Sequence, residues 1–153
     1  MLAGCPAQRT VLRIVDLADP GSPKRLFEEF TDCCFSAEVD GTVQILLRRA
    51  SPSERDPRQV IHQVVVIDTA YRPVPGTSFV EATMINATLR YVIATGPDAL
   101  RYEGAGFVSF TRSRDGRTLV GKVESGQLAP RGVAGSPVYP FGEATMSGEF
   151  RAK

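Results

Sequence analysis

Residues 34–49 read CFSAEVDGTVQILLRR and carry the clearest structural signal in the chain. Apolar and polar residues alternate on both sides of Asp40-Gly41, the period of two that is typical of half-buried β-strands. Asp-Gly between two such runs indicates a tight hairpin turn, because both residues tolerate positive φ. The stretch therefore predicts an antiparallel hairpin from Cys34 to Arg49.

Further strand patterns flank this hairpin, separated by segments rich in glycine, proline and aspartate. The predicted strands are Val11–Leu17, Val60–Thr69, Phe79–Thr95, Tyr102–Ser113, Thr118–Leu128 and Glu143–Ala152. The R-D-G-R segment at 114–117 lies between two of them and predicts a second hairpin. Polar, proline-containing segments predict surface loops at Ala50–Arg58 and Pro130–Pro140.

One segment, S-P-K-R-L-F-E-E-F at 22–30, has the pattern of a short helix. Its Ser-Pro start suits an N-cap followed by the first helical position. Leu26, Phe27 and Phe30 then share one helical face. We therefore expect one helix of about two turns near the N-terminus.

Glycines inside the predicted strands indicate curvature, since a strand glycine marks a bulge, a bend or a close backbone approach. They are Gly104, Gly106, Gly121 and Gly148. The predicted fold is all-β apart from the short helix, and is an antiparallel β-sandwich or a small curved barrel. We expect one β-rich domain over 11–153, with 1–10 as a tether.

The composition narrows the function only by exclusion. A net charge of +1 over 153 residues gives no field that would attract nucleic acid. No stretch reaches the ~18 apolar residues that a spanning helix requires. The basic pairs Lys24-Arg25 and Arg48-Arg49 are predicted to be solvated ends of strands or loops.

Catalytic motifs give little support for an enzyme. His62 is the single histidine, so a Ser-His or Cys-His device would have to use it. It lies in the apolar run V-I-H-Q-V-V-V, which favours a structural role. Because no zinc-type spacing, phosphate loop or dinucleotide motif occurs, we expect no catalytic residue, no cofactor and no metal.

Tyr71 and Arg72 open the proline-rich segment Y-R-P-V-P-G, which predicts a stiff, displayed loop. Such a loop is either a binding surface or a rigid connection between strands. One or both of Cys33 and Cys34 are predicted to be small core residues, and a bridge from Cys5 to either remains open in an oxidising compartment.

Leu2-Ala3-Gly4-Cys5 resembles the lipobox of bacterial lipoproteins: Leu, a small residue, Gly or Ala, then Cys. The resemblance covers four residues and implies that Cys5 is acylated and becomes the N-terminus. Only Met1 to Gly4 precede it here, so we expect the charged and apolar parts of a signal peptide to be encoded upstream. A chance match would instead leave the protein in the cytoplasm.

Together these features predict a bacterial cell-envelope lipoprotein, a non-enzymatic binding or structural module held at the membrane through Cys5. Two alternatives stay open: a small-ligand-binding β-barrel, and a small hydrolase that uses His62. A barrel whose core is filled by side chains would count against the ligand-binding alternative. The protein or small-molecule partner is not specified by the sequence.

Overall fold

The computed structural model describes residues 9–17, 21, 25–37, 42–69, 85–96, 98–131 and 142–153. Its strands are β1 (Thr10–Asp16), β2 (Arg25–Phe30), β3 (Asp32–Ala37), β4 (Val43–Pro52), β5 (Val60–Thr69), β6 (Ala87–Thr95), β7 (Asp98–Arg112), β8 (Leu119–Arg131) and β9 (Ala144–Ala152). All of them belong to a single antiparallel sheet. The all-β prediction is confirmed, and the single curled sheet excludes the sandwich alternative.

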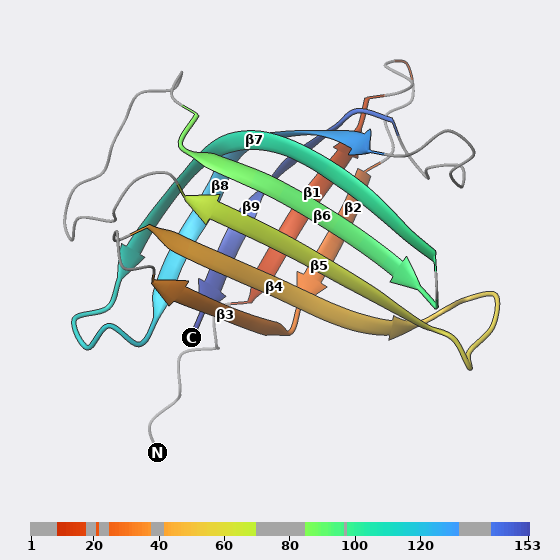
Figure 1. The fold of residues 1–153 in the computed structure, drawn as a ribbon, viewed down its shortest axis with the longest axis horizontal. Coiled ribbons are helices and arrows are strands. Elements are labelled where there is room, and N and C mark those ends of the chain that lie inside the picture. The colour runs from red at the N-terminus through yellow and green to blue at the C-terminus, as the bar shows by residue number, and fades with distance from the viewer. Residues whose placement is uncertain are drawn as a thin grey trace.

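The sheet curls into a half-barrel, so that β4, β5 and β6 arch in front of β1, β2 and β9 in Figure 1. Its strand order is β2-β1-β9-β8-β7-β6-β5-β4-β3, which makes the two edge strands consecutive in the chain. Thr31 alone separates them, and its amide donates to the Arg48 carbonyl oxygen at 3.1 Å.

The two edges diverge from Thr31. In the described pairings β2 lies beside β1 and β3 lies beside β4, so β2 and the second half of β4 face each other without a strand pairing. We call this line between β2 and β4 the seam. The second half of β4 runs along the seam toward the end of the half-barrel that carries the β4–β5 and β6–β7 connections, at the right of Figure 1.

The inner face of the curled sheet holds the core. Every described strand contributes alternate apolar side chains to it, as the period of two predicts. Its largest fully buried members include Tyr91, Tyr102, Phe150, Leu12, Ile14, Ile45, Leu47, Ile67, Leu89, Leu119 and Met146. These side chains form one apolar core along the described interior.

The central hairpin is confirmed. β3 and β4 pair from Asp32 with Arg48 to Ala37 with Val43, although the Asp-Gly turn lies outside the described residues. β5 has the predicted bounds Val60–Thr69. The β7–β8 hairpin is confirmed too, and its turn places Gly116 at φ 75°.

The predicted helix is wrong, since Arg25–Phe30 forms strand β2. Leu26 and Phe30 would share one face in a helix and also share one in the strand. The strand, however, turns Phe27 outward, and 67% of that residue is exposed. An isolated helix of two turns is too short to be stable in water, whereas β1 supplies a row of backbone partners for this segment.

Several strand boundaries also differ from the prediction. β7 begins at Asp98, four residues before the predicted start at Tyr102, because Asp98 already pairs with Thr95 of β6. β4 continues to Pro52, which pairs with Val60, so the predicted loop begins three residues later. β8 continues to Arg131, because Pro130 still pairs with Tyr102 of β7. β6 begins at Ala87, and the start of the longer predicted strand, 79–84, lies outside the described residues.

Glycines allow the tight curvature, as predicted. A Cβ on Gly104 would lie 1.6 Å from the Gln127 carbonyl oxygen, closer than any side chain tolerates. Gly148 has φ 145°, and a Cβ there would lie 2.3 Å from the Val11 carbonyl oxygen. It pairs with Val123, where the register between β8 and β9 shifts. Glycine therefore permits the close strand approach and the bulge.

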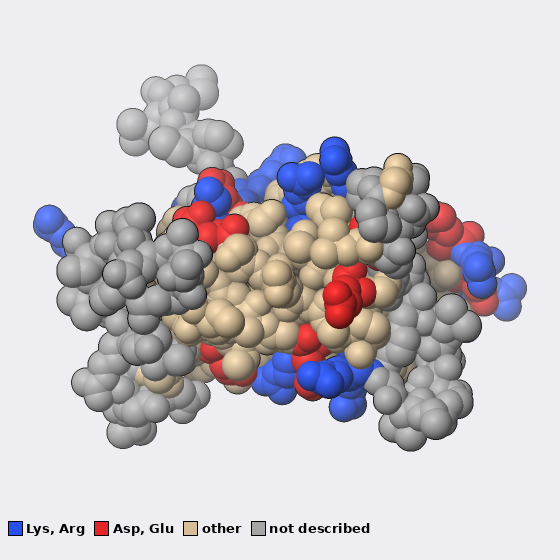
Figure 2. Space-filling view, turned by 90° about the horizontal axis from the view of Figure 1, so that it is seen from above, with Lys and Arg blue, Asp and Glu red and all other residues tan. Residues whose placement is uncertain are grey.

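The outer face differs in character from the core. Seen from above, the face around β6 and β7 shows a mostly uncharged band, with one acidic group inside it and further charged residues along its rims (Figure 2). Among the described residues there is no helix with the length and hydropathy needed to cross a bilayer.

Candidate functional site

Polar side chains interrupt the apolar inner face near the seam. They are Glu28 from β2, Arg49 from β4, Gln63 from β5 and Tyr91 from β6, and we call them the seam cluster. Each lies at an inward position of its strand, because each is two residues from a core residue on the same strand.

The strand register places inward residues of the four neighbouring strands β4, β5, β6 and β7 side by side. Arg49 pairs with Gln63, Gln63 with Ile93, and Ile93 with Leu100, so these four side chains form one row across β4 to β7. The next row toward the core holds Leu47, Val65, Tyr91 and Tyr102, all fully buried. The cluster thus lies where the packed core ends.

Glu28 and Arg49 form an ion pair across the seam, where backbone pairing between β2 and β4 is missing from the described residues. The contact joins one guanidinium nitrogen, Nη1, to one carboxylate oxygen, Oε2. The Arg49 side chain is only 25% exposed and the Glu28 side chain only 18%, so solvent screens this pair less than it screens a surface pair. A guanidinium has five N–H donors, and this contact occupies part of that capacity.

Gln63 and Tyr91 form the deeper half of the cluster. The Gln63 amide nitrogen donates to the Tyr91 hydroxyl at 2.6 Å. Burial raises the pKa of Tyr91 to about 12, outweighing the hydrogen bond from Gln63, which lowers it. The Tyr91 and Tyr102 rings lie 5.9 Å apart between centroids. Tyr91 therefore stays neutral at physiological pH and acts through its hydrogen bond.

Apolar side chains border the cluster. Leu26, Ile93 and Leu100 pack against the core and remain only partly buried. Leu26 is two residues before Glu28 on β2, and Ile93 and Leu100 belong to the row of Arg49 and Gln63. A few convergent polar groups beside apolar surface are the usual make-up of a small-molecule site.

The sequence interpretation missed this cluster. It treated Arg48-Arg49 as one solvated pair, which is right for Arg48 and wrong for Arg49. A signal was present: Val43, Ile45 and Leu47 set the inward positions of the strand, and Arg49 is the next of them.

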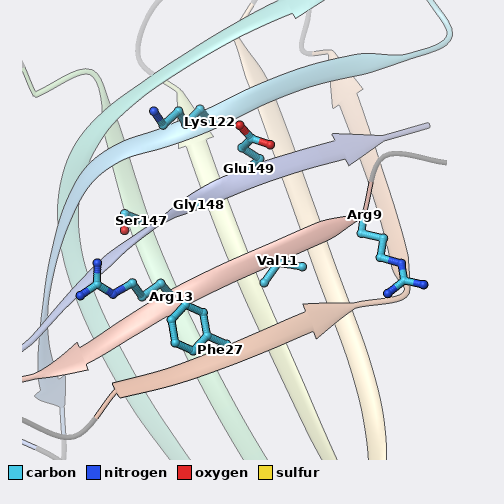
Figure 3. Close-up of a pocket in the computed structure, with 8 residues that line it drawn as sticks. All are labelled: Arg9, Val11, Arg13, Phe27, Lys122, Ser147, Gly148 and Glu149. Carbon is cyan, nitrogen blue, oxygen red and sulfur yellow. The ribbon is translucent and has the colours of Figure 1, made fainter. Parts of the chain in front are cut away.

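A second feature is a depression of about 370 Å³ on the outer face (Figure 3). Its lining residues are Arg9, Val11, Arg13, Phe27, Lys122, Ser147, Gly148 and Glu149. Arg9 and Lys122 each lie within ion-pair distance of a glutamate, at 3.7 and 3.4 Å, and Glu149 is the cross-strand partner of Lys122. These opposed, exposed charges leave little net attraction for an ion, so we do not assign a ligand here.

The sequence-predicted residues do not meet at one site. His62 is exposed on the outer face between Ala50 and Ala94, its partners on the neighbouring strands. Cys33 and Cys34 are free thiols on opposite faces of β3. Cys5, Tyr71 and Arg72 lie outside the described residues.

No group of His, Cys, Asp and Glu in the described part of the chain could hold a metal ion. Comparison of the chain with family models, with curated proteins and with solved structures found no match. The geometry of the seam cluster and the sequence motifs therefore remain as the indications of function.

Proposed function

We propose that the protein is a non-catalytic binding module that takes a small molecule at the seam cluster, and that lipid on Cys5 holds it at the bacterial cell envelope. The observation that carries the binding proposal is the convergence of Glu28, Arg49 and Gln63 on an inner face that is otherwise mostly apolar, Thr10 and Thr69 being its other buried polar residues.

Stability alone does not account for this choice of residues. Replacing a buried ion pair by apolar residues of similar volume is often neutral or stabilising. The neighbouring inward positions of β4 and β5 are Leu47 and Val65, so the strands already favour such residues there. Sites where a chain departs from its own pattern are expected to be functional or strained. The described non-glycine residues have no positive φ, which favours function over strain.

Several features support binding without catalysis. Tyr91 is held in its neutral form, and the Glu28 carboxylate is paired with a guanidinium. A general base needs a pKa close to the working pH and a reachable proton. His62 lies on the opposite face of the sheet.

The binding proposal is tested by NMR titration of the isotope-labelled chain with short-chain alcohols, amides, acids and amines. We expect at least one probe to shift the amide signals of Gln63, Ile93 and Leu100 in a saturable manner. Arg49→Gln should change that response. Arg48→Gln is the matched control, because Arg48 is the adjacent residue on the outer face. A panel that leaves all three signals unmoved contradicts the proposal.

The anchor proposal rests on the lipobox resemblance and needs its own test. The gene with its upstream reading frame is expressed in a bacterium with labelled palmitate. We expect label in the wild-type protein and none in Cys5→Ser. Absence of label from both, or an upstream frame without an apolar segment, contradicts it.

A further inference from the structure

We infer that the ligand of the seam cluster carries an uncharged polar head, of the primary-amide kind, on a short apolar chain. This inference rests on the proposed binding function and specifies its ligand class. Three properties of the cluster support it: its charge, its hydrogen-bonding capacity and the apolar side chains beside it.

The charge of the cluster is already balanced. Glu28 and Arg49 neutralise each other, and Gln63 is uncharged. Moving an ion into a half-buried place without a counter-charge costs far more than moving a neutral polar group. A carboxylate would have to compete with Glu28 for Arg49, and an ammonium would have to compete with Arg49 for Glu28. A neutral head avoids both penalties.

The hydrogen-bonding capacity left in the cluster matches an amide. Gln63 uses one N–H on Tyr91, which leaves its second N–H and its carbonyl oxygen. Arg49 uses Nη1 on Glu28, which leaves the donors on its other nitrogens. No described residue takes up the Gln63 carbonyl oxygen or the remaining Arg49 nitrogens, and none of these unpaired atoms is fully buried, although Gln63 as a whole is only 7% exposed. Donors of Arg49 and the acceptor of Gln63, which pair across β4 and β5, therefore lie side by side and are not fully buried.

The apolar chain has a place beside this head. Ile93 and Leu100 continue the row that contains Arg49 and Gln63, and both remain partly exposed. A chain lying on them gains about 0.8 kcal/mol for each CH₂ group that it buries. The packed core beyond, at Leu47 and Val65, restricts the chain to a short one.

The experiment compares hexanamide, hexanol, hexanoate and hexylamine as ligands of the wild-type chain in the NMR titration at neutral pH. We expect hexanamide to bind most tightly. Hexanoate and hexylamine should each bind at least about tenfold more weakly, since an uncompensated buried charge costs more than a factor of ten in affinity. If hexanoate or hexylamine equals hexanamide at Gln63, Ile93 and Leu100, the inference is overturned while the binding function stands. If no probe shifts these signals, the binding function itself fails.

Two variants test the charge argument directly. Glu28→Gln leaves Arg49 without its counter-ion, so hexanoate should gain about tenfold in affinity relative to hexanamide. Arg49→Gln leaves Glu28 unpaired, so hexylamine should gain instead. Asp32→Asn, which breaks the ion pair with Arg48 on the outer face, should leave the order unchanged. An order that moves in neither of the first two variants overturns the inference. If a variant fails to fold, the wild-type series still decides.

Discussion

Arg48 and Arg49 are adjacent on β4, and each forms an ion pair with a carboxylate, yet the two pairs lie on opposite faces of the sheet. The Arg48–Asp32 pair is on the outer face, with side chains 50% and 63% exposed. The Arg49–Glu28 pair is on the inner face, with side chains 25% and 18% exposed. The comparison shows that side-chain alternation along a strand gives identical chemistry two different energetic roles.

On the outer face, water competes for both partners, and such pairs contribute about 0–1 kcal/mol. On the inner face, the pair replaces lost hydration and also joins two strands that lack backbone pairing there. Inner-face changes should therefore be costly and specific, while outer-face changes should be mild.

The largest expected difference in the free energy of unfolding is between substitutions at Gly104, on the inner face of β7, and at Ala105, on its outer face. Gly104→Ala places a Cβ 1.6 Å from the Gln127 carbonyl oxygen of the neighbouring strand, so it should destabilise the fold by about 3 kcal/mol or more, or prevent folding. Ala105→Gly, one residue further and on the outer face, should cost only about 0.5–1 kcal/mol. Urea unfolding of both variants measures the difference. Equal losses contradict the close approach of β7 and β8.

The ion pairs give the next contrast. Arg49→Leu leaves Glu28 as a mostly buried, unpaired carboxylate and should lower the free energy of unfolding by about 2–3 kcal/mol. Arg48→Leu should change it by less than about 1 kcal/mol. The double variant Glu28→Leu with Arg49→Leu should recover most of the loss, because no lone charge remains. Urea denaturation of these variants gives the values. A double variant as unstable as the single one would show that the pair itself holds the seam together.

Alkaline pH tests the inner face through Tyr91. Its pKa is raised from 10.0 to about 12 in the folded chain, so the unfolded chain loses this proton first as the pH rises. The free energy of unfolding should therefore fall between pH 10 and 12, by about 2–3 kcal/mol from this residue. Tyr91→Phe should show a shallower fall over that range in pH-dependent urea unfolding. An identical pH dependence in the two proteins contradicts the assignment.

The sequence allowed much of the sheet to be predicted, because alternation and turn chemistry are local signals. β5 and the inward residues Ala144, Met146, Phe150 and Ala152 of β9 followed from period two alone. The helix predicted at β2 was wrong because two residues four positions apart, such as Leu26 and Phe30, lie on the same face of a strand and also on the same face of a helix. The partner strand β1, which decides between them, is a tertiary feature.

The seam cluster was beyond local reasoning for a related physical reason. Glu28 and Arg49 are 21 positions apart, and they meet because the curl of the whole sheet brings β2 back toward β4. The curvature itself was signalled by glycines such as Gly104, but its extent depends on the register of every strand pair. No pattern within β2 or β4 specifies that their side chains meet across an unpaired edge.

The smallest expected contrast lies within one dipeptide. Cys33 faces inward, its thiol donates to the Phe30 carbonyl oxygen at 3.5 Å, and burial raises its pKa. Cys34 faces outward beside Leu46. Because the thiolate is the reactive form, Cys33 should react with iodoacetamide several times more slowly than Cys34 near neutral pH. The measurement uses Cys33→Ser and Cys34→Ser in a Cys5→Ser background, so that one thiol is followed at a time. Equal rates would mean that the two faces of β3 are equally open to solvent, and the division between inner and outer faces would then not extend to this edge of the sheet.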